Sequence, residues 1–161
     1  MLYIIYDIIM KKIVIDTNIF VSALFSNKGA SFKLIALILQ LFEDKKIKLN
    51  CISVPSILEL EDVMFRPCFS ERLSHLSKEE LDGYIDDIVF ISSKTKLSYL
   101  WRPFLKDADD DKILETAINS QAKCIVTYNI KDFKNVEKYF DIKIITPNNY
   151  LSMIEQEKEM L

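Results

Sequence analysis

Two short apolar runs constrain the fold most strongly, because neither alternates with polar residues. They are Ile13-Val14-Ile15 and Cys124-Ile125-Val126-Thr127. A strand with apolar side chains on both faces is typical of a parallel sheet that helices cover on either side. We therefore expect both runs to lie inside a buried parallel sheet.

Helical patterns separate the strand-like runs along the chain. Strands are expected at 13–15, 47–53, 94–97, 124–127 and 143–145, and helices at 17–25, 31–44, 55–66, 76–90, 107–118, 129–135 and from 147 onward. Ser77 and Glu80 form a capping-box pattern, and Pro55 and Pro147 suit first helical turns. The alternation of strands and helices predicts an α/β protein, a three-layer α/β/α sandwich around a mostly parallel sheet.

The composition bounds the fold and excludes some functions. The chain has 161 residues, 50% of them hydrophobic, with only 2 glycines and 4 prolines. This predicts a single domain, 1–161, with its core at about 11–151. Two glycines leave no room for a glycine-rich phosphate loop, so we set nucleotide cofactors aside. A net charge of −3 argues against binding nucleic acid by charge alone, but not against a nuclease whose metal ions supply positive charge.

The cysteines, the histidine and the first residues add further limits. Cys51, Cys68 and Cys124 lack zinc-finger spacing, so we interpret Cys51 and Cys124 as core residues in a reducing cytoplasm. His75 is the single histidine, so a histidine pair for acid–base catalysis is excluded. The apolar run 1–9 is too short to cross a membrane, and lysines follow it rather than precede it. We expect this run to be an added strand or an upstream start.

The segment from Ser31 to Phe42 is apolar on nearly all sides of its expected helix. Such a helix is either buried within the chain or part of an interface. We expect it to form a homodimer or partner-binding surface, and full burial within one chain is the alternative.

Four acidic residues stand where a single site could gather them. Asp16 closes the first strand, Glu59 lies early in the next strand's helix, Asp110 begins a helix, and Asp132 follows the run at 124–127. Ligands of parallel α/β sheets bind at the carboxyl ends of the strands. Carboxylates that meet there repel one another unless a divalent cation lies between them, and Mg²⁺ or Mn²⁺ prefers oxygen ligands. Water bound to such an ion can attack a phosphodiester.

The same acidic residues also have a purely structural interpretation. Most of the 24 aspartates and glutamates are expected to face solvent. Carboxylates in a first helical turn favour the helix dipole, which would explain Asp107, Asp109 and Asp111. Asp16 could be a helix cap. Glu59 lies in the acidic stretch 59–62, so by itself it does not indicate a site. Spacing alone leaves both interpretations open.

Four segments resemble the motifs of PIN-domain nucleases, in the order of that family. They are Ile13-Val14-Ile15-Asp16-Thr17-Asn18-Ile19, Pro55-Ser56-Ile57-Leu58-Glu59-Leu60, Asp107-Ala108-Asp109-Asp110-Asp111-Lys112-Ile113-Leu114 and Ile125-Val126-Thr127-Tyr128-Asn129-Ile130-Lys131-Asp132-Phe133. The resemblance implies a twisted parallel sheet between helices and endoribonuclease activity that depends on Mg²⁺ or Mn²⁺. Arg66-Pro67 and the acidic run are similar to the branch that contains toxins of toxin–antitoxin pairs. That similarity implies a cytoplasmic protein with an RNA substrate, an antitoxin partner and a homodimeric state.

Carried over by position, the resemblance makes Asp16, Glu59 and Asp110 catalytic metal ligands. Some relatives have an aspartate where this chain has Asn129, so Asp132 is the nearest carboxylate for the fourth position. Thr127 and Asn129 would orient these ligands by hydrogen bonds. Further supporting residues are Asn18, Asp107 and Asp111. If the third motif is shifted by a residue, the alternative ligands are Asp107, Asp109 and Asp111.

Basic residues that flank the acidic motifs are the candidates for phosphate contacts, although each is equally well interpreted as solvated surface. These residues are Arg102, Lys106, Lys112, Lys131 and Lys134. One rival function is a catalytically weak PIN module that binds RNA or a protein, which Asn129 favours. Another is phosphoryl transfer through a nucleophilic Asp16, but many such phosphatases have a second aspartate where this chain has Asn18.

Overall fold

Five short parallel strands form the centre of the part of the chain that the structure describes, residues 11–159 of a computed structural model. They are β1 (Ile13–Ile15), β2 (Cys51–Ile52), β3 (Ser93–Lys94), β4 (Cys124–Val126) and β5 (Lys143–Ile145). One ladder has the order β1-β4-β5, and the other pairs β2 with β3. Ile15 lies opposite Val126, which lies opposite Ile145, so these three strands end side by side.

A buried asparagine joins the two ladders. The backbone N–H of Ile13 donates to the carbonyl of Leu49 at 3.1 Å, and the N–H of Ile15 donates to Asn50 Oδ1, also at 3.1 Å. The amide of Asn50 in turn donates to Ser92 Oγ at 2.9 Å, next to β3. Because a side chain takes over part of the ladder, β2 is shorter than the strand expected at 47–53.

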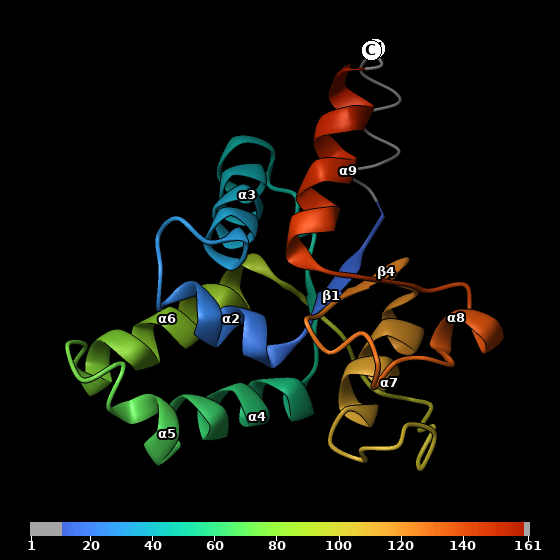
Figure 1. Cartoon of the computed structure of the whole chain (residues 1–161), viewed down its shortest axis with the longest axis horizontal. Helices are drawn as coiled ribbons and strands as arrows, with labels where there is room; N and C mark the ends of the chain where they lie inside the picture. Colours follow the sequence, from blue (N-terminus) through green and yellow to red (C-terminus); the bar gives the residue numbers. More distant parts are fainter. Residues whose placement is uncertain (1–10, 160–161) are drawn as a thin grey trace.

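Eight helices flank the sheet within residues 11–159. They are α2 (Thr17–Ala23), α3 (Ala30–Lys45), α4 (Val54–Met64), α5 (Pro67–Ser70), α6 (Lys78–Ile91), α7 (Asp111–Ser120), α8 (Val136–Tyr139) and α9 (Pro147–Glu159). Ile13 and Ile15 join a core cluster with α2, α3, α4, α6 and α9, whereas Val14 joins another with α7 and α8. Helices therefore cover both faces (Figure 1), and the three-layer α/β/α prediction is confirmed.

Local signals placed most helix boundaries correctly. The predicted capping box is confirmed, because Glu80 N–H donates to Ser77 Oγ at 3.1 Å and Ser77 N–H to Glu80 Oε2 at 2.7 Å. A turn and a short helix were expected at 129–135: the turn is confirmed, but the helix, α8, begins only at Val136. Helix α5 was not predicted. The run expected at 1–9 lies outside the described residues.

Helix α3 is buried along one stripe only. Ser31, Leu34 and Ile38 are buried, whereas Phe32 and Leu39 are exposed. Full burial within the chain, the alternative weighed for this helix, is therefore wrong. A second copy or another protein on this face stays a prediction. Within residues 11–159, no helix combines the length and the apolar character needed to cross a membrane.

Candidate functional site

Asp16 is fixed at the carboxyl end of β1. Its N–H donates to the carbonyl of Val126 at 3.0 Å, and its Oδ2 accepts a hydrogen bond of 2.7 Å from Thr127 Oγ1. The side chain is buried, and the backbone of Thr17 and Asn18 at the start of α2 also interacts with it. Burial raises the pKa of Asp16, and the bond from Thr127 opposes part of that rise.

Glu59 reaches the same place from the second turn of α4. Thr17, the residue after Asp16, donates its hydroxyl to Glu59 Oε2 at 3.2 Å. Lys112 Nζ lies 3.7 Å from Glu59 Oε1. Burial raises the pKa of Glu59, the charge of Lys112 lowers it, and the charge of Asp16 raises it.

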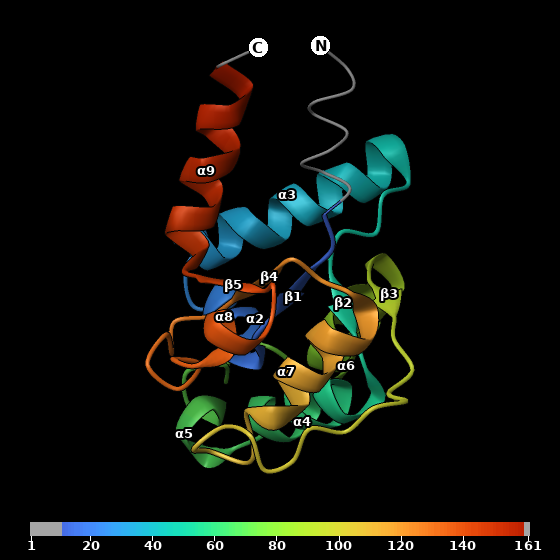
Figure 2. The ribbon, with the colours of Figure 1, turned by 90° about the vertical axis from the view of Figure 1, so that its right-hand side faces the viewer.

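A buried cluster of hydroxyl groups holds α4 against α7, and the two helices lie side by side (Figure 2). Ser53 Oγ lies 2.6 Å from Ser56 Oγ and 2.7 Å from Thr116 Oγ1. Glu59 is one turn beyond Ser56, and Lys112 is one turn before Thr116. This cluster therefore sets the approach of Glu59 to the start of α7, where Asp110 stands.

Asp110 precedes α7 and lies in the combined field of the other carboxylates. Its pKa is raised from 3.8 to about 7. Burial is the largest cause, followed by the negative charges of Asp16, Asp107, Asp132 and Glu59. The carboxylates that the sequence assigned to one site therefore do repel one another in the fold.

Asp132 belongs to the turn after β4. Thr127 Oγ1 accepts from the N–H of Asn129 at 2.9 Å, and Asp132 N–H donates to the carbonyl of Asn129 at 3.0 Å. The charge of Asp132 raises the pKa of both Asp16 and Asp110. Asn129 itself is exposed. Thr127 thus orients Asp16 and the turn that carries Asp132 together.

The other acidic residues of the third motif serve the loop before α7. Asp111 is buried and accepts from the N–H of Leu105 at 2.9 Å. Asp107 accepts from the N–H of Asp109 at 3.0 Å and is exposed. Asp109 lies 3.5 Å from Lys112. Asn18 is exposed at the start of α2.

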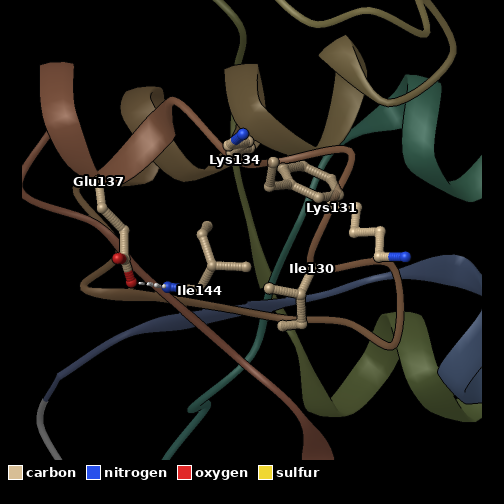
Figure 3. Close-up of a pocket in the computed structure, with 6 residues that line it drawn as sticks. Ile130, Lys131, Lys134, Glu137 and Ile144 are labelled. Atoms are coloured by element: carbon tan, nitrogen blue, oxygen red, sulfur yellow. Dashed lines mark hydrogen bonds between the residues drawn. The ribbon is translucent and has the colours of Figure 1, made fainter.

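The basic residues predicted to contact RNA differ in how free they are. Arg102 is paired with the buried Glu115 at 2.8 Å, and Lys112 is paired within the site. Lys106 is exposed. Lys131 and Lys134 line a pocket of about 600 Å³, in which Glu137 accepts from the N–H of Ile144 (Figure 3). Among the basic residues predicted to contact RNA, the most accessible charges are therefore those of Lys106, Lys131 and Lys134.

The donors of this site suit a hard divalent cation. Its carboxylates supply oxygen atoms alone, and their mutual repulsion is what such an ion relieves. Within residues 11–159, no three acidic, histidine or cysteine side chains already form a coordination sphere. Glu59 instead faces Thr17 and Lys112, so an ion would have to replace the ammonium group of Lys112.

Sequence reasoning missed the polar residues that position these carboxylates. Ser53 and Thr116 were not singled out, Thr17 was named only as part of the first motif, and Lys112 was named as a candidate phosphate contact and not as a partner of Glu59. Thr17 was visible, because a hydroxyl directly after a strand-ending aspartate can reach a neighbouring helix. The contact between Ser53 and Thr116 joins residues far apart in the chain and left no local signal.

Comparison with known proteins identifies the family of this chain. The PIN domain family model matches residues 12–131. The uncharacterized protein MJ1680 of Methanocaldococcus jannaschii is 30% identical over 159 residues, which span 90% of this chain and 92% of that protein. The chain belongs to the PIN-domain family. Proteins of this family are generally nucleases and generally use divalent metal ions.

Proposed function

We propose that this protein is a metal-dependent endoribonuclease that hydrolyses phosphodiester bonds of RNA. In this proposal, the residues that bind the metal ions and catalyse the reaction are Asp16, Glu59, Asp110 and Asp132. The observation that carries this proposal is the field at Asp110, where burial and the other carboxylates raise the pKa from 3.8 to about 7. A site with so much uncompensated negative charge favours a divalent cation.

The chain contributes position and charge to the reaction. Thr127 holds the carboxylate of Asp16, and Thr17 holds that of Glu59, so both are oriented before a substrate arrives. Mg²⁺ or Mn²⁺, when bound, would acidify a water molecule and neutralise phosphate oxygens. With an ion at Glu59, Lys112 would no longer pair with that carboxylate and would be free to face the phosphate.

The finer role we propose is that of a toxin paired with an antitoxin protein. Arg66-Pro67 and the acidic run before α7 support this role by their similarity to that branch of the family. The exposed Phe32 and Leu39 on α3 offer a surface for a second copy or for the antitoxin. Light scattering that shows a monomer at high concentration would count against the homodimer.

RNA cleavage tests the nuclease directly. We expect the parent to cut RNA with Mn²⁺ and to lose this activity in EDTA, and we expect Asp16→Asn to be inactive in both. Asp86→Asn, which changes an exposed aspartate on α6, is the matched control and should behave like the parent. Equal activity of all three proteins with and without EDTA would overturn the proposal.

A catalytically weak module that binds RNA or a protein is the second candidate. Two observations favour it: Asn129 stands where some relatives have an aspartate, and Lys112 is paired with Glu59 at 3.7 Å. Both lower the affinity expected for a cation. A protein that binds RNA but neither Mn²⁺ nor Mg²⁺ would support this candidate.

A further inference from the structure

The segment between β3 and α7 is held rigidly by one face of α7. Three α7 side chains one turn apart, Asp111, Glu115 and Asn119, bind its backbone. Asn119 Oδ1 accepts from the N–H groups of Ser98 and Tyr99 at 2.8 and 3.0 Å, and Glu115 accepts from that of Trp101 at 3.0 Å. Asp111 holds Leu105, so the segment follows α7 back to its first turn (Figure 2).

This rigid segment presents apolar side chains to solvent. Tyr99, Leu100 and Trp101 are 70%, 65% and 46% exposed. Trp101 stacks edge-on against Phe140, and Phe104 against Tyr139 of α8, which is 62% exposed. Large apolar groups exposed together on a fixed backbone mark a binding surface rather than a core. We call Tyr99, Trp101, Phe104, Tyr139 and Phe140 the aromatic platform.

The charge around the platform identifies its occupant. Residues 88–106 contain Lys94, Lys96, Arg102 and Lys106 and no acidic residue, in a chain whose net charge is −3. Arg102 is paired with the buried Glu115, so the three lysines carry the charge of this stretch. Lys138 lies 5.3 Å from the ring centre of Tyr139. On the α8 side, Asp141 is paired with Lys123, and Glu137 accepts from the N–H of Ile144. A basic stretch interleaved with aromatic rings is complementary to single-stranded nucleic acid.

We propose that the aromatic platform binds single-stranded RNA, with bases stacked on Tyr99, Trp101 and Tyr139 and phosphates held by Lys94, Lys96 and Lys106. The segment that carries the platform ends at Asp110, so a strand lying along it leads to the carboxylate site. This inference rests on the proposed function for the nature of the substrate, but binding to the platform needs neither a metal ion nor cleavage.

Trp101 is the single tryptophan of the chain and reports on the platform. In EDTA, titration with oligouridylate should quench its fluorescence, because a stacked base alters its surroundings. Tyr99→Ala should weaken binding of end-labelled oligouridylate by about 5-fold to 150-fold, measured by anisotropy. Phe90→Ala removes an aromatic ring that is 63% exposed on α6, across the sheet, and should bind like the parent.

The lysines are tested by salt dependence. Each of Lys94→Gln, Lys96→Gln and Lys106→Gln should lower the slope of log affinity against log salt by about 0.7, whereas Lys78→Gln on α6 should not. Unchanged Trp101 fluorescence on RNA binding, or parent-like affinity of Tyr99→Ala, would overturn the platform. Quenching by a protein partner but not by oligouridylate would overturn it too.

The same variants separate this inference from the nuclease proposal. Asp16→Asn should bind oligouridylate in EDTA as the parent does, although it should not cleave RNA. If oligouridylate binds as expected but the parent does not cleave RNA, the nuclease proposal is wrong and the platform proposal stands. If the parent cleaves RNA and Tyr99→Ala does so with an unchanged KM, the platform proposal is wrong and the nuclease proposal stands.

Discussion

Replacing Asp110 with asparagine should stabilise the metal-free protein at neutral pH. The folded protein holds this carboxyl at a pKa of about 7, mainly through burial and then through neighbouring charges, whereas its ordinary value is 3.8. An acid whose pKa is raised by folding stabilises the fold at low pH and loses that contribution as pH rises through the folded value. The parent in EDTA should therefore become less stable between about pH 4 and pH 7.

The size of the effect follows from the same shift. A rise from 3.8 to about 7 corresponds to at most about 4 kcal/mol at pH 7.5. Asp110 is only partly buried, so solvent screening reduces our expectation to about 1–2 kcal/mol. Asparagine has nearly the same shape and is an equally good residue before a helix, so the change isolates the charge.

Urea denaturation in EDTA, followed by circular dichroism at pH 3.5 and pH 7.5, measures this prediction. Asp110→Asn should be more stable than the parent at pH 7.5 and nearly equal to it below pH 4. Saturating Mn²⁺ should stabilise the parent by about 2–3 kcal/mol and the variant by less. A variant that is less stable than the parent at pH 7.5 in EDTA would refute the electrostatic argument.

Three further variants probe the positioning residues. Glu115→Gln weakens the buried partner of Arg102 and should lower the free energy of unfolding by about 1–3 kcal/mol in thermal melts; an unchanged melt would contradict the role assigned to this pair. Ser77→Ala removes the cap of α6 and should cost about 1 kcal/mol by urea denaturation, and no loss would speak against the capping box. Thr127→Val removes the hydrogen bond to Asp16 and should weaken Mn²⁺ binding about 10-fold to 100-fold in calorimetry; parent-like affinity would show that Thr127 does not orient the site.

The sequence predicted the layers well because their signals are local. The strand at Ile13–Ile15 and the helix that begins after Ser77 follow from periodicity and capping over a few residues. Strand β2 could not be predicted in length, because the side chain of Asn50, rather than a longer backbone ladder, joins it to β1. The turn at 129–135 was predicted, but the start of the short helix after it was not, because no side-chain cap marks it.

The candidate site was predictable in its carboxylates and not in their partners. Asp16 and Asp110 stand at element ends that a parallel sheet must bring to one edge. The acidic run at 107–111 reads as a uniform helix start, yet Asp111 turns inward to the backbone of Leu105 while Asp110 faces the other carboxylates. Which member of such a run turns inward depends on a distant loop, and no local pattern encodes that choice. The pairing of Lys112 with Glu59 was missed for the same reason, since Glu59 lies on another helix.

Calorimetric titration with Mn²⁺ tests most directly whether these carboxylates share a cation. We predict that the parent binds Mn²⁺, that Asp86→Asn binds it equally well, and that Asp16→Asn and Asp110→Asn lose most of the affinity. A parent that binds no Mn²⁺, or an Asp16→Asn variant that binds it as tightly as the parent, would contradict this prediction.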